Sequence, residues 1–512
     1  MIITKAELLK KHPLYDVLLS SWRFYSACYD GINAMIAEGI LAKHDRESVK
    51  NFESRKKEAF DFGYSKAIVD IFNFYTHEKE TKNNYSKLGQ DELFQQFLDD
   101  SDLWGTSWED FLRTQSKNAS IYGHVGILVD KPQGKVANRE EAKKGNLYPY
   151  ATAFMPPAIL DWKVERNEQG RPELSMVKLL EDGGSVLLWT KDEWQRWDIK
   201  DSEARALGSG VNPLQEIPFY WFYNFKHREI RNIGISDLTR ISYIEASMVR
   251  NLSHGEEVIK YAAFPMLRKP YPKQVAGAQN DDVVGVTGVL EFDPQLPDSK
   301  PDWLPSSVGE PITAMLSWLE LKIIQIYRAA NTGGVQSVEA TRYAKSGEAL
   351  KREFQLLNSV LTAKSKSEIE AELWGLYYWT KWQGIEQLYD DVTIDRSTDY
   401  SIADLSTELE NALTGKALIK SPTFNVELQQ RLVRQLMPGL DNDTQEVIDA
   451  EIEQAVGVKE KTEPAQTGSQ DSQTVGQVNN LTSTPGINSV NNAQINDMIK
   501  NLMANTDQGG NA

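Results

Sequence analysis

The sequence offers few residues whose types and spacing suit catalysis. Thr414-Gly415-Lys416 is the fragment nearest to a phosphate-binding P-loop, but it lacks the upstream glycine and the hydroxyl that binds magnesium. His254-Gly255-Glu256-Glu257 has the residue types of a zinc-protease motif without the spacing that puts two imidazoles on one helical face. The chain contains no complete P-loop and no Gly-x-Ser-x-Gly elbow. These absences disfavour an ATPase motor, a zinc protease and a serine hydrolase.

The remaining reactive side chains are scattered. The aspartates at 99–102 and 281–282 are expected to lie in solvated loops, because neither segment has the alternating oxygen pattern of a calcium loop. Cys28 is the only cysteine, which excludes an intramolecular disulfide and favours a reducing compartment. We therefore expect no enzyme activity, no metal and no cofactor. Each histidine is expected to be a surface or satisfied core residue: His12, His44, His77, His124, His227 and His254.

Charge and composition describe an acidic, folded protein. The 512 residues include 56 Lys and Arg against 73 Asp and Glu, a formal net charge of −17. Such a chain repels DNA on average, because Lys and Arg contacts supply most of the affinity for phosphate backbones. The 13 Trp, 20 Tyr and 17 Phe supply a large core. The first residues have no signal-peptide layout and no apolar run approaches the length of a membrane span, so we expect neither secretion nor membrane insertion.

The N-terminal half changes from helix to sheet. Helical spacing dominates the first 120 residues, and Ser107 with Asp110 predicts the start of one helix. Gly123 and Gly126 predict a turn into a strand at 127–130. An aromatic-rich antiparallel sheet is expected beyond it, with strands at 159–166, 173–180, 185–190, 194–199 and 217–223.

The C-terminal half is built around two helices that flank an insertion. Ser236 is expected to cap a helix that reaches about Ala262, and Pro311 to open a second helix that ends near Ala330. Eight prolines between Pro265 and Pro311, both included, exclude a helix between them. The apolar face of the second helix is predicted to contain Ile312, Met315, Leu316, Leu319, Ile323 and Ile326.

Downstream elements alternate with breaks. A glycine-containing break at 331–337 leads into a helix at about 346–382, which is long enough to be either kinked or part of an extended assembly. A strand is expected at 392–395 and three short helices at 402–458. The polar tail that follows is expected to be disordered.

This order of elements resembles the portal proteins of tailed bacteriophages. The segment at 119–130 looks like the portal segment in which a helix ends at a glycine and leads into a strand, and Ser346-Gly347-Glu348-Ala349-Leu350-Lys351 looks like the element that opens the long helix after the tunnel loop. The segments at 410–421 and 451–453 are similar to the C-terminal helical module. There the spacing departs from the family pattern, because three residues separate Gly415 from Ile419 and Lys420 precedes Ser421.

The resemblance implies an α+β, mainly helical portal fold that forms a ring around a central channel. It assigns the wing to 1–234 and 338–401, and the stem helices to 235–262 and 309–330. The clip would be 263–308, the tunnel loop 331–337, the crown 402–458 and the disordered tail 459–512. The expected channel-facing residues are Lys322, Arg328, Asn331, Gly333, Gly334, Val335 and Gln336.

The function implied by the resemblance is a dodecameric channel at one capsid vertex of the virion, assembled in the host cytoplasm. Double-stranded DNA would be packaged and ejected through it without sequence-specific binding. The implied partners are further copies of the chain, the terminase, the major capsid or scaffolding protein and a head-tail adaptor, with no membrane. Two alternatives stay open: another phage structural or adaptor protein without a DNA channel, and an enzyme with dispersed catalytic residues.

Overall fold

The computed structural model of the chain contains helices and antiparallel sheets in two compact units, Met1–Ile402 and Ala403–Ala512. The combination agrees with the expected α+β class. No helix among the described residues is long and apolar enough to cross a membrane. The structure describes residues 4–45, 47–79, 81–132, 141, 145, 147–200, 203–263, 267–268, 302–303, 309–331, 347–398, 400, 414, 419, 421–437 and 442–461.

The N-terminal part of the first unit is helical, as the sequence predicts. Ser107 caps the helix at Trp108–Tyr122 by accepting a hydrogen bond from Asp110 N, and Gly123, with a φ of 94°, ends that helix in the left-handed region that glycine tolerates. The helices are α1 (Lys5–Leu8), α2 (Pro13–Asp30), α3 (Ile32–Ala37), α4 (Val49–Glu58), α5 (Tyr64–Thr76), α6 (Glu92–Asp99) and α7 (Trp108–Tyr122). The short 3-10 helix η1 (Ser86–Gln90) precedes α6.

Two antiparallel sheets follow. The three-stranded sheet has the order β3-β2-β9, with β2 (His124–Asp130) between β3 (Tyr150–Phe154) and β9 (Phe219–Tyr223). The five-stranded sheet is a meander in chain order: β4 (Ile159–Arg166), β5 (Pro172–Leu180), β6 (Ser185–Thr190), β7 (Glu193–Asp198) and β8 (Arg205–Val211). Two-residue pairings join β10 (Phe225–Lys226) to β11 (Gly234–Ile235), and β1 (Lys82–Asn84) pairs with β14 (Thr393–Asp395).

The three-stranded sheet is buried on both faces, so its central strand reads as a continuous apolar run. Side chains alternate along a strand, and Leu128 therefore faces the five-stranded sheet while Ile127 faces α6 and α7. On the neighbouring strand β9, Trp221 likewise faces the five-stranded sheet and Phe222 faces the helices. The interior thus consists of a sheet with a helical layer on one side and a second sheet on the other.

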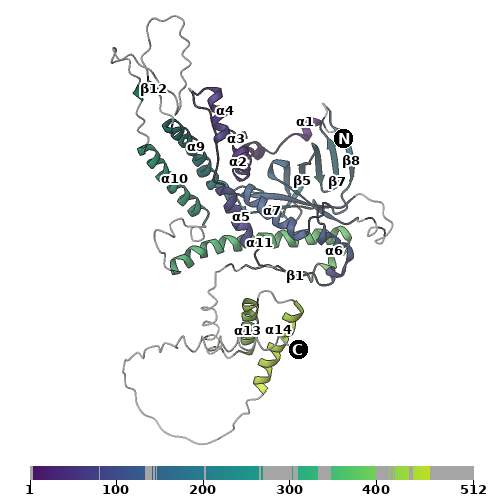
Figure 1. Ribbon diagram of the computed structural model, residues 1–512. Coiled ribbons are helices and arrows are strands. Elements are labelled where there is room, and N and C mark those ends of the chain that lie inside the picture. Colours follow the sequence, from purple (N-terminus) through teal and green to yellow (C-terminus); the bar gives the residue numbers. More distant parts are fainter. Residues whose placement is uncertain are drawn as a thin grey trace, which may run out of the picture. The chain divides into compact units, whose positions relative to one another are not determined.

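Three long helices complete the first unit. They are α9 (Leu238–Ala263), α10 (Gly309–Ala329) and α11 (Gly347–Gln383), and α9 and α10 lie side by side while α11 runs across their base (Figure 1). α11 is one continuous helix of 37 residues. Leu252 of α9, Leu319 of α10 and Leu357 of α11 share one apolar core with Phe72 of α5. The short segment η5 (Glu386–Leu388) leads from α11 to β14.

The second unit contains two described helices, α13 (Pro422–Leu436) and α14 (Asn442–Lys461). Ser421 caps α13, with a proline at its first position. Arg434 of α13 forms an ion pair with Asp449 of α14 at 3.3 Å, which indicates that the helices pack against each other. The third helix expected at 402–458 lies outside the described residues. The disordered tail was expected from residue 459, but α14 continues to Lys461, and the rest of the tail lies outside the described residues.

Most of the expected strands are present, and the errors have physical reasons. Gly126 is not part of a turn but lies inside β2, where a β-carbon would come within 2.2 Å of Phe219 Cζ, so the glycine is needed for close packing. Strand β8 was not predicted, because it is mostly exposed and contains Gly208 and Gly210, which are poor strand formers. β-carbons at both glycines would meet the Trp194 ring of the adjacent strand.

Candidate functional site

The helix pair formed by α9 and α10 contains the predicted stem helices, and its contacts fix an antiparallel register. Lys322 Nζ donates to Ser247 Oγ at 2.8 Å. A β-carbon on Gly255 would lie 2.5 Å from Met315 Cε, so the missing side chain lets the methionine lie directly on α9. Between these contacts α9 advances by eight residues while α10 goes back by seven, as two antiparallel helices of equal rise require.

The segment inserted between the two helices starts and ends at one place. Strand β12 (Leu267–Arg268) pairs with β13 (Asp302–Trp303) in antiparallel register, with Leu267 opposite Trp303. Leu267 and Trp303 are each twelve residues beyond the Gly255–Met315 contact, on the two sides of the insertion, so the strand pairing extends the antiparallel register of the helix pair. The predicted insertion at 263–308 is otherwise outside the described residues.

The described residues that were expected to line a channel differ in their surroundings. Lys322 is buried between the two helices, where burial, and then the charge of Arg250, lower the pKa of its ammonium group. Arg328 is exposed near the end of α10, and Asn331 follows it with a left-handed φ of 57°. Gly333, Gly334, Val335 and Gln336 lie outside the described residues. The channel-facing role of all seven residues stays a prediction.

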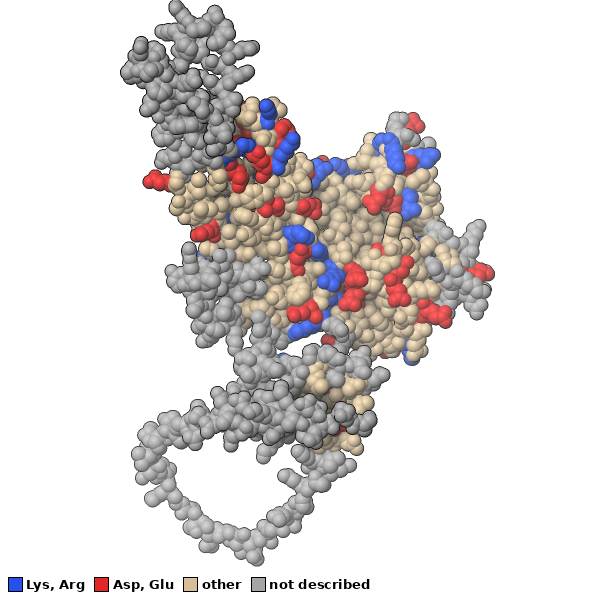
Figure 2. Space-filling view, viewed as in Figure 1, with Lys and Arg blue, Asp and Glu red and all other residues tan. Residues whose placement is uncertain are grey.

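The outward side of α10 presents three large apolar side chains among polar residues such as Ser317 and Glu320. Leu316, Trp318 and Leu321 are 54%, 51% and 44% exposed. The sequence grouped Leu316 with Leu319 and Ile326 on one apolar face. The structure separates them, because Leu319 and Ile326 are buried on the inward stripe with Lys322 while Leu316 is exposed. In Figure 2 the surface over α10 is mostly uncharged, with isolated acidic side chains. A helix that is apolar on both sides normally has a partner on both sides.

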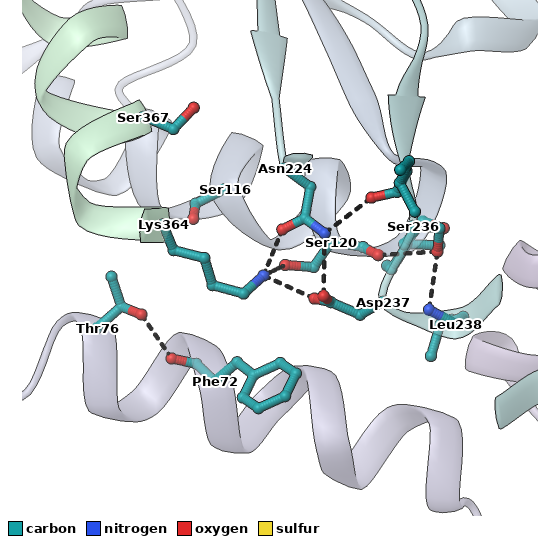
Figure 3. A network of polar contacts seen from close by, with 12 residues as sticks. Phe72, Thr76, Ser116, Ser120, Asn224, Ser236, Asp237, Leu238, Lys364 and Ser367 are labelled. Carbon is teal, nitrogen blue, oxygen red and sulfur yellow. Dashed lines mark hydrogen bonds and ion pairs between the residues drawn. The ribbon is translucent and has the colours of Figure 1, made fainter. Parts of the chain in front are cut away.

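A buried polar network fixes the start of α9 to α11 (Figure 3). We call Ser120, Asn224, Asp237 and Lys364 the anchor network. Lys364 Nζ donates to Ser120 Oγ at 2.8 Å, to Asp237 Oδ2 at 2.6 Å and to Asn224 Oδ1. Asn224 Nδ2 donates to Asp237 Oδ1 at 3.0 Å and to Ile235 O. One ammonium group thus joins α11, the end of α7, the end of β9 and the segment that opens α9.

The backbone next to the anchor network is closely packed. Ser236 caps α9 by accepting from Leu238 N, as the sequence predicts, and its hydroxyl donates to Ile121 O at 2.6 Å. The chain crosses itself here, because a β-carbon on Gly234 would lie 1.9 Å from Gly123 O. Only two glycines permit this crossing, which fixes where α9 leaves the sheet.

Two further contacts hold α9 along its length. Glu245, buried at mid-helix, accepts from Ser65 N at 2.9 Å and from the Ser65 hydroxyl, and burial raises its pKa. Farther along, Arg55 Nη1 donates to Ser253 Oγ at 3.2 Å while Arg55 Nη2 pairs with Glu47 at 2.7 Å. The hydrogen bonds from Arg55 lower the pKa of Glu47 to about 2. α9 is therefore held by the first turn of α5 and by α4.

A buried ion cluster lies one turn beyond Lys364 on α11. Arg396 pairs with Glu368 at 2.9 Å and with Glu372 at 3.4 Å, while His77 lies 3.3 Å from Glu368 and Asn83 Nδ2 donates to Glu372. Burial raises the pKa of Glu372 to about 7. Burial acts in the same direction on Glu368, but His77 and Arg396 outweigh it and lower the pKa of that carboxyl group. The cluster ties α11 to α5, β1 and the segment after β14.

Sequence reasoning missed the anchor network and the ion cluster. Lys364, Glu368 and Glu372 recur every four residues on the stripe of α11 that also contains Leu361 and Leu376. Charged residues that fall on the apolar stripe of a helix signal buried ion pairs, and that pattern was available in the sequence. Across the described ranges, no cluster of three or more His, Cys, Asp or Glu side chains is arranged to hold a metal ion.

Comparisons with known proteins return structural likenesses only. No protein-family model matches the chain, and no curated protein matches it. The neck of an empty gene transfer agent (GTA) particle, computed with C6 symmetry, is similar with a TM-score of 0.43 and 12% identity, over 72% of this chain and 90% of that chain. A chain from the virion of a native GTA particle is similar with a TM-score of 0.39 and 12% identity, over 82% of this chain and 99% of that chain. A chain from the neck of a native GTA particle, computed with C12 symmetry, is similar with a TM-score of 0.39 and 12% identity, over 80% of this chain and 94% of that chain. At these values the likenesses fix neither a family nor a role.

Proposed function

We propose that this chain is a phage-type portal protein, which forms a ring at one vertex of a capsid and lets double-stranded DNA pass through its centre. In this proposal α9 and α10 are the stem helices and the segment between them is the clip, which docks the packaging terminase and later the head-tail adaptor. The major capsid or scaffolding protein would surround the ring, and the protein would reside in the virion. The proposal includes no catalytic site.

The observation that carries the proposal is the two-sided helix pair. Its inner side packs on α5 and α11 of the same chain, while Leu316, Trp318 and Leu321 leave the outer side of α10 apolar and uncovered. Burying such a surface stabilises by roughly 25 cal/mol per Å². Repeated contact between neighbouring copies through such a face, with the helix pairs side by side, forms a closed ring when the rotation between copies divides a full turn evenly and involves no shift along the axis.

The negative charge of the chain supports a role as a channel through which DNA passes without being bound. Twelve copies at −17 each would carry roughly −200, which opposes tight binding of a polyanion. DNA that must move through a channel is slowed by every strong phosphate contact. Arg328 at the exposed end of α10 can contribute a local cation without changing that balance.

Assembly is the first test. Size-exclusion chromatography with light scattering, followed by negative-stain imaging, is expected to show rings with a central hole. Trp318→Glu with Leu321→Glu should leave a folded monomer, because both side chains are half exposed in the single chain. Val211→Glu with Phe74→Glu is the matched control, since it adds the same charge at exposed apolar positions on other elements. A wild-type protein that stays monomeric at high concentration contradicts the proposal.

DNA passage is the second test and separates a portal from a phage structural protein without a channel. Deleting residues 332–338, which removes all of the predicted tunnel loop except residue 331 together with the first residue after it, should spare the ring and impair packaging or retention of DNA. A packaging assay on assembled particles measures this. Rings with the deletion that package as well as wild type would remove the tunnel-loop assignment.

A further inference from the structure

The loop between α6 and α7 is held in one shape by hydrogen bonds along its length. Asp102 Oδ1 accepts from Trp104 N at 2.9 Å, and Asp100 Oδ1 accepts from Gly105 N at 2.8 Å. Tyr148 OH donates to Asp100 O at 3.0 Å and ties the loop to the chain that leads into β3. The loop is thus an ordered feature with its carboxylates turned inward to its own backbone.

This ordered loop presents two apolar side chains to solvent. We call Leu103 and Trp104 the tip. Trp104 is 91% exposed and Leu103 is 42% exposed. Leu103 also has a φ of 64°, a left-handed conformation that costs a non-glycine residue about 1–2 kcal/mol. A strained, hydrogen-bonded loop that holds a tryptophan in water is unfavourable for the isolated chain, and exposed tryptophans on rigid loops are typical binding anchors.

A preformed aromatic pocket lies elsewhere on the same unit, between the start of α2, the β4–β5 hairpin and the loop between β10 and β11. Its volume is about 600 Å³. His12 stacks on Trp162 with ring centroids 3.8 Å apart, and Trp162 meets Trp221 edge-on at 5.3 Å. Val164, which is exposed, and Ile230 add aliphatic surface to the lining. We call this cavity the aromatic pocket.

We propose that the tip of one copy inserts into the aromatic pocket of a second copy. The tip is exposed and therefore does not fill the pocket of its own chain, so the two surfaces can meet only between copies. An indole side chain buries 150–250 Å² and packs favourably against the edges and faces of other aromatic rings. The contact uses different surfaces on the two copies and is heterologous, which lets it repeat around a ring. It is separate from the outer side of α10.

Charge selects this pocket over the alternative. Residues 99–112 contain five carboxylates and no Lys or Arg, so the region around the tip is acidic even though Asp100 and Asp102 are hydrogen-bonded to the loop backbone. Two charged residues line the aromatic pocket. Glu229 pairs with the adjacent Arg228 at 2.5 Å, whereas Arg231 is an exposed cation for which the described part of the chain supplies no ion pair.

A second cavity, of about 640 Å³, is lined by Glu181, Asp182 and Arg196. Arg196 pairs with Glu181 at 2.8 Å, so Asp182 leaves the lining with a net negative charge that would repel the acidic tip region.

Disulfide cross-linking between two variants, each with one added cysteine, tests the contact. A copy with Leu103→Cys, which keeps the Trp104 indole, is mixed with a copy with Val164→Cys, oxidised mildly and run on a non-reducing gel, where a band of twice the chain mass is expected. The native thiol gives little background, because Cys28 is buried and burial raises its pKa to about 12. Val49→Cys replaces Val164→Cys in the matched control, since Val49 is an exposed valine on α4.

Each outcome decides the proposal. A cross-link in the Leu103→Cys and Val164→Cys mixture at least tenfold stronger than in the Val49→Cys control supports it. Cross-links only between two Leu103→Cys copies would mean a symmetric contact and overturn it. The absence of any cross-link at the highest concentration reached also overturns it. Charge exchange gives a second readout: Asp99→Arg or Arg231→Asp alone should weaken self-association, and the double variant should restore it. Rings that form without the cross-link leave the portal proposal standing.

Discussion

Lys364 illustrates how one buried charge can fix the direction of a helix. Its ammonium group neutralises Asp237, and both side chains are almost completely buried. Lys364→Met should leave the aspartate without its cation and cost about 3–5 kcal/mol of unfolding free energy. Chemical denaturation followed by tryptophan fluorescence measures this loss. Lys366→Met, an exposed position on the same helix, should change stability by less than about 0.5 kcal/mol.

The double variant decides whether the charge pair or the packing is responsible. Lys364→Met combined with Asp237→Asn removes both charges, so it should recover part of the loss. Equal losses in the single and double variants would show that Lys364 acts through its aliphatic chain.

The pKa of Glu372 predicts a pH dependence. Burial raises that pKa to about 7, so the folded protein holds this proton more tightly than the unfolded chain. The stabilisation from Glu372 is complete below the unfolded value near 4.5 and is lost as the pH rises through about 7. Glu372→Gln removes the titration. Between pH 5 and pH 8 the variant should therefore gain up to about 3 kcal/mol relative to wild type.

Denaturation midpoints at the two pH values provide the measurement for Glu372. Glu370→Gln is the control, because this carboxylate is exposed and pairs with Lys226 at the surface. A constant difference between Glu372→Gln and wild type would mean that Arg396 keeps Glu372 charged throughout the range.

At the scale of elements, the crossing of Gly123 and Gly234 sets where the helix pair leaves the sheet. Gly234→Ala would force a β-carbon against Gly123 O, a backbone atom that cannot move aside. We expect a loss of more than about 3 kcal/mol in unfolding free energy, or an insoluble protein. Gly309→Ala, for which the described structure leaves open space, should be neutral or slightly stabilising. Comparable stabilities for the two variants would mean that the backbones separate easily.

The elements themselves were largely predictable, and the connections between them were not. Strong periodicity and caps predicted α9, α10 and most strands of the meander, since those signals are local. Gly126 and Leu316 were misplaced because their roles depend on distant partners, the Phe219 ring and the face that α10 turns to α9. The anchor network joins residues more than 100 positions apart, so only the charged positions on the stripe of α11 hinted at it.

At the scale of the whole molecule, association between copies depends on two apolar surfaces that favour it and on a net charge that disfavours it. The outer side of α10 and the tip both favour association between copies, whereas −17 per chain opposes it. The apolar contacts are short-ranged and insensitive to salt. The repulsion acts over the Debye length, about 10 Å at 0.1 M and about 3 Å at 1 M ionic strength.

Assembly should therefore increase with salt. Raising NaCl from 0.1 M to 1 M screens the repulsion and leaves the burial of Trp318 and Leu321 intact, so light scattering should show a larger assembled fraction at equal protein concentration. The pairing of Asp99 with Arg231 across the tip contact would weaken in the same change, but an exposed pair contributes at most about 1 kcal/mol. Trp318→Glu with Leu321→Glu should stay monomeric at both concentrations. Rings that dissociate in 1 M NaCl would show that ion pairs hold the copies together, and the apolar side of α10 would then need another partner.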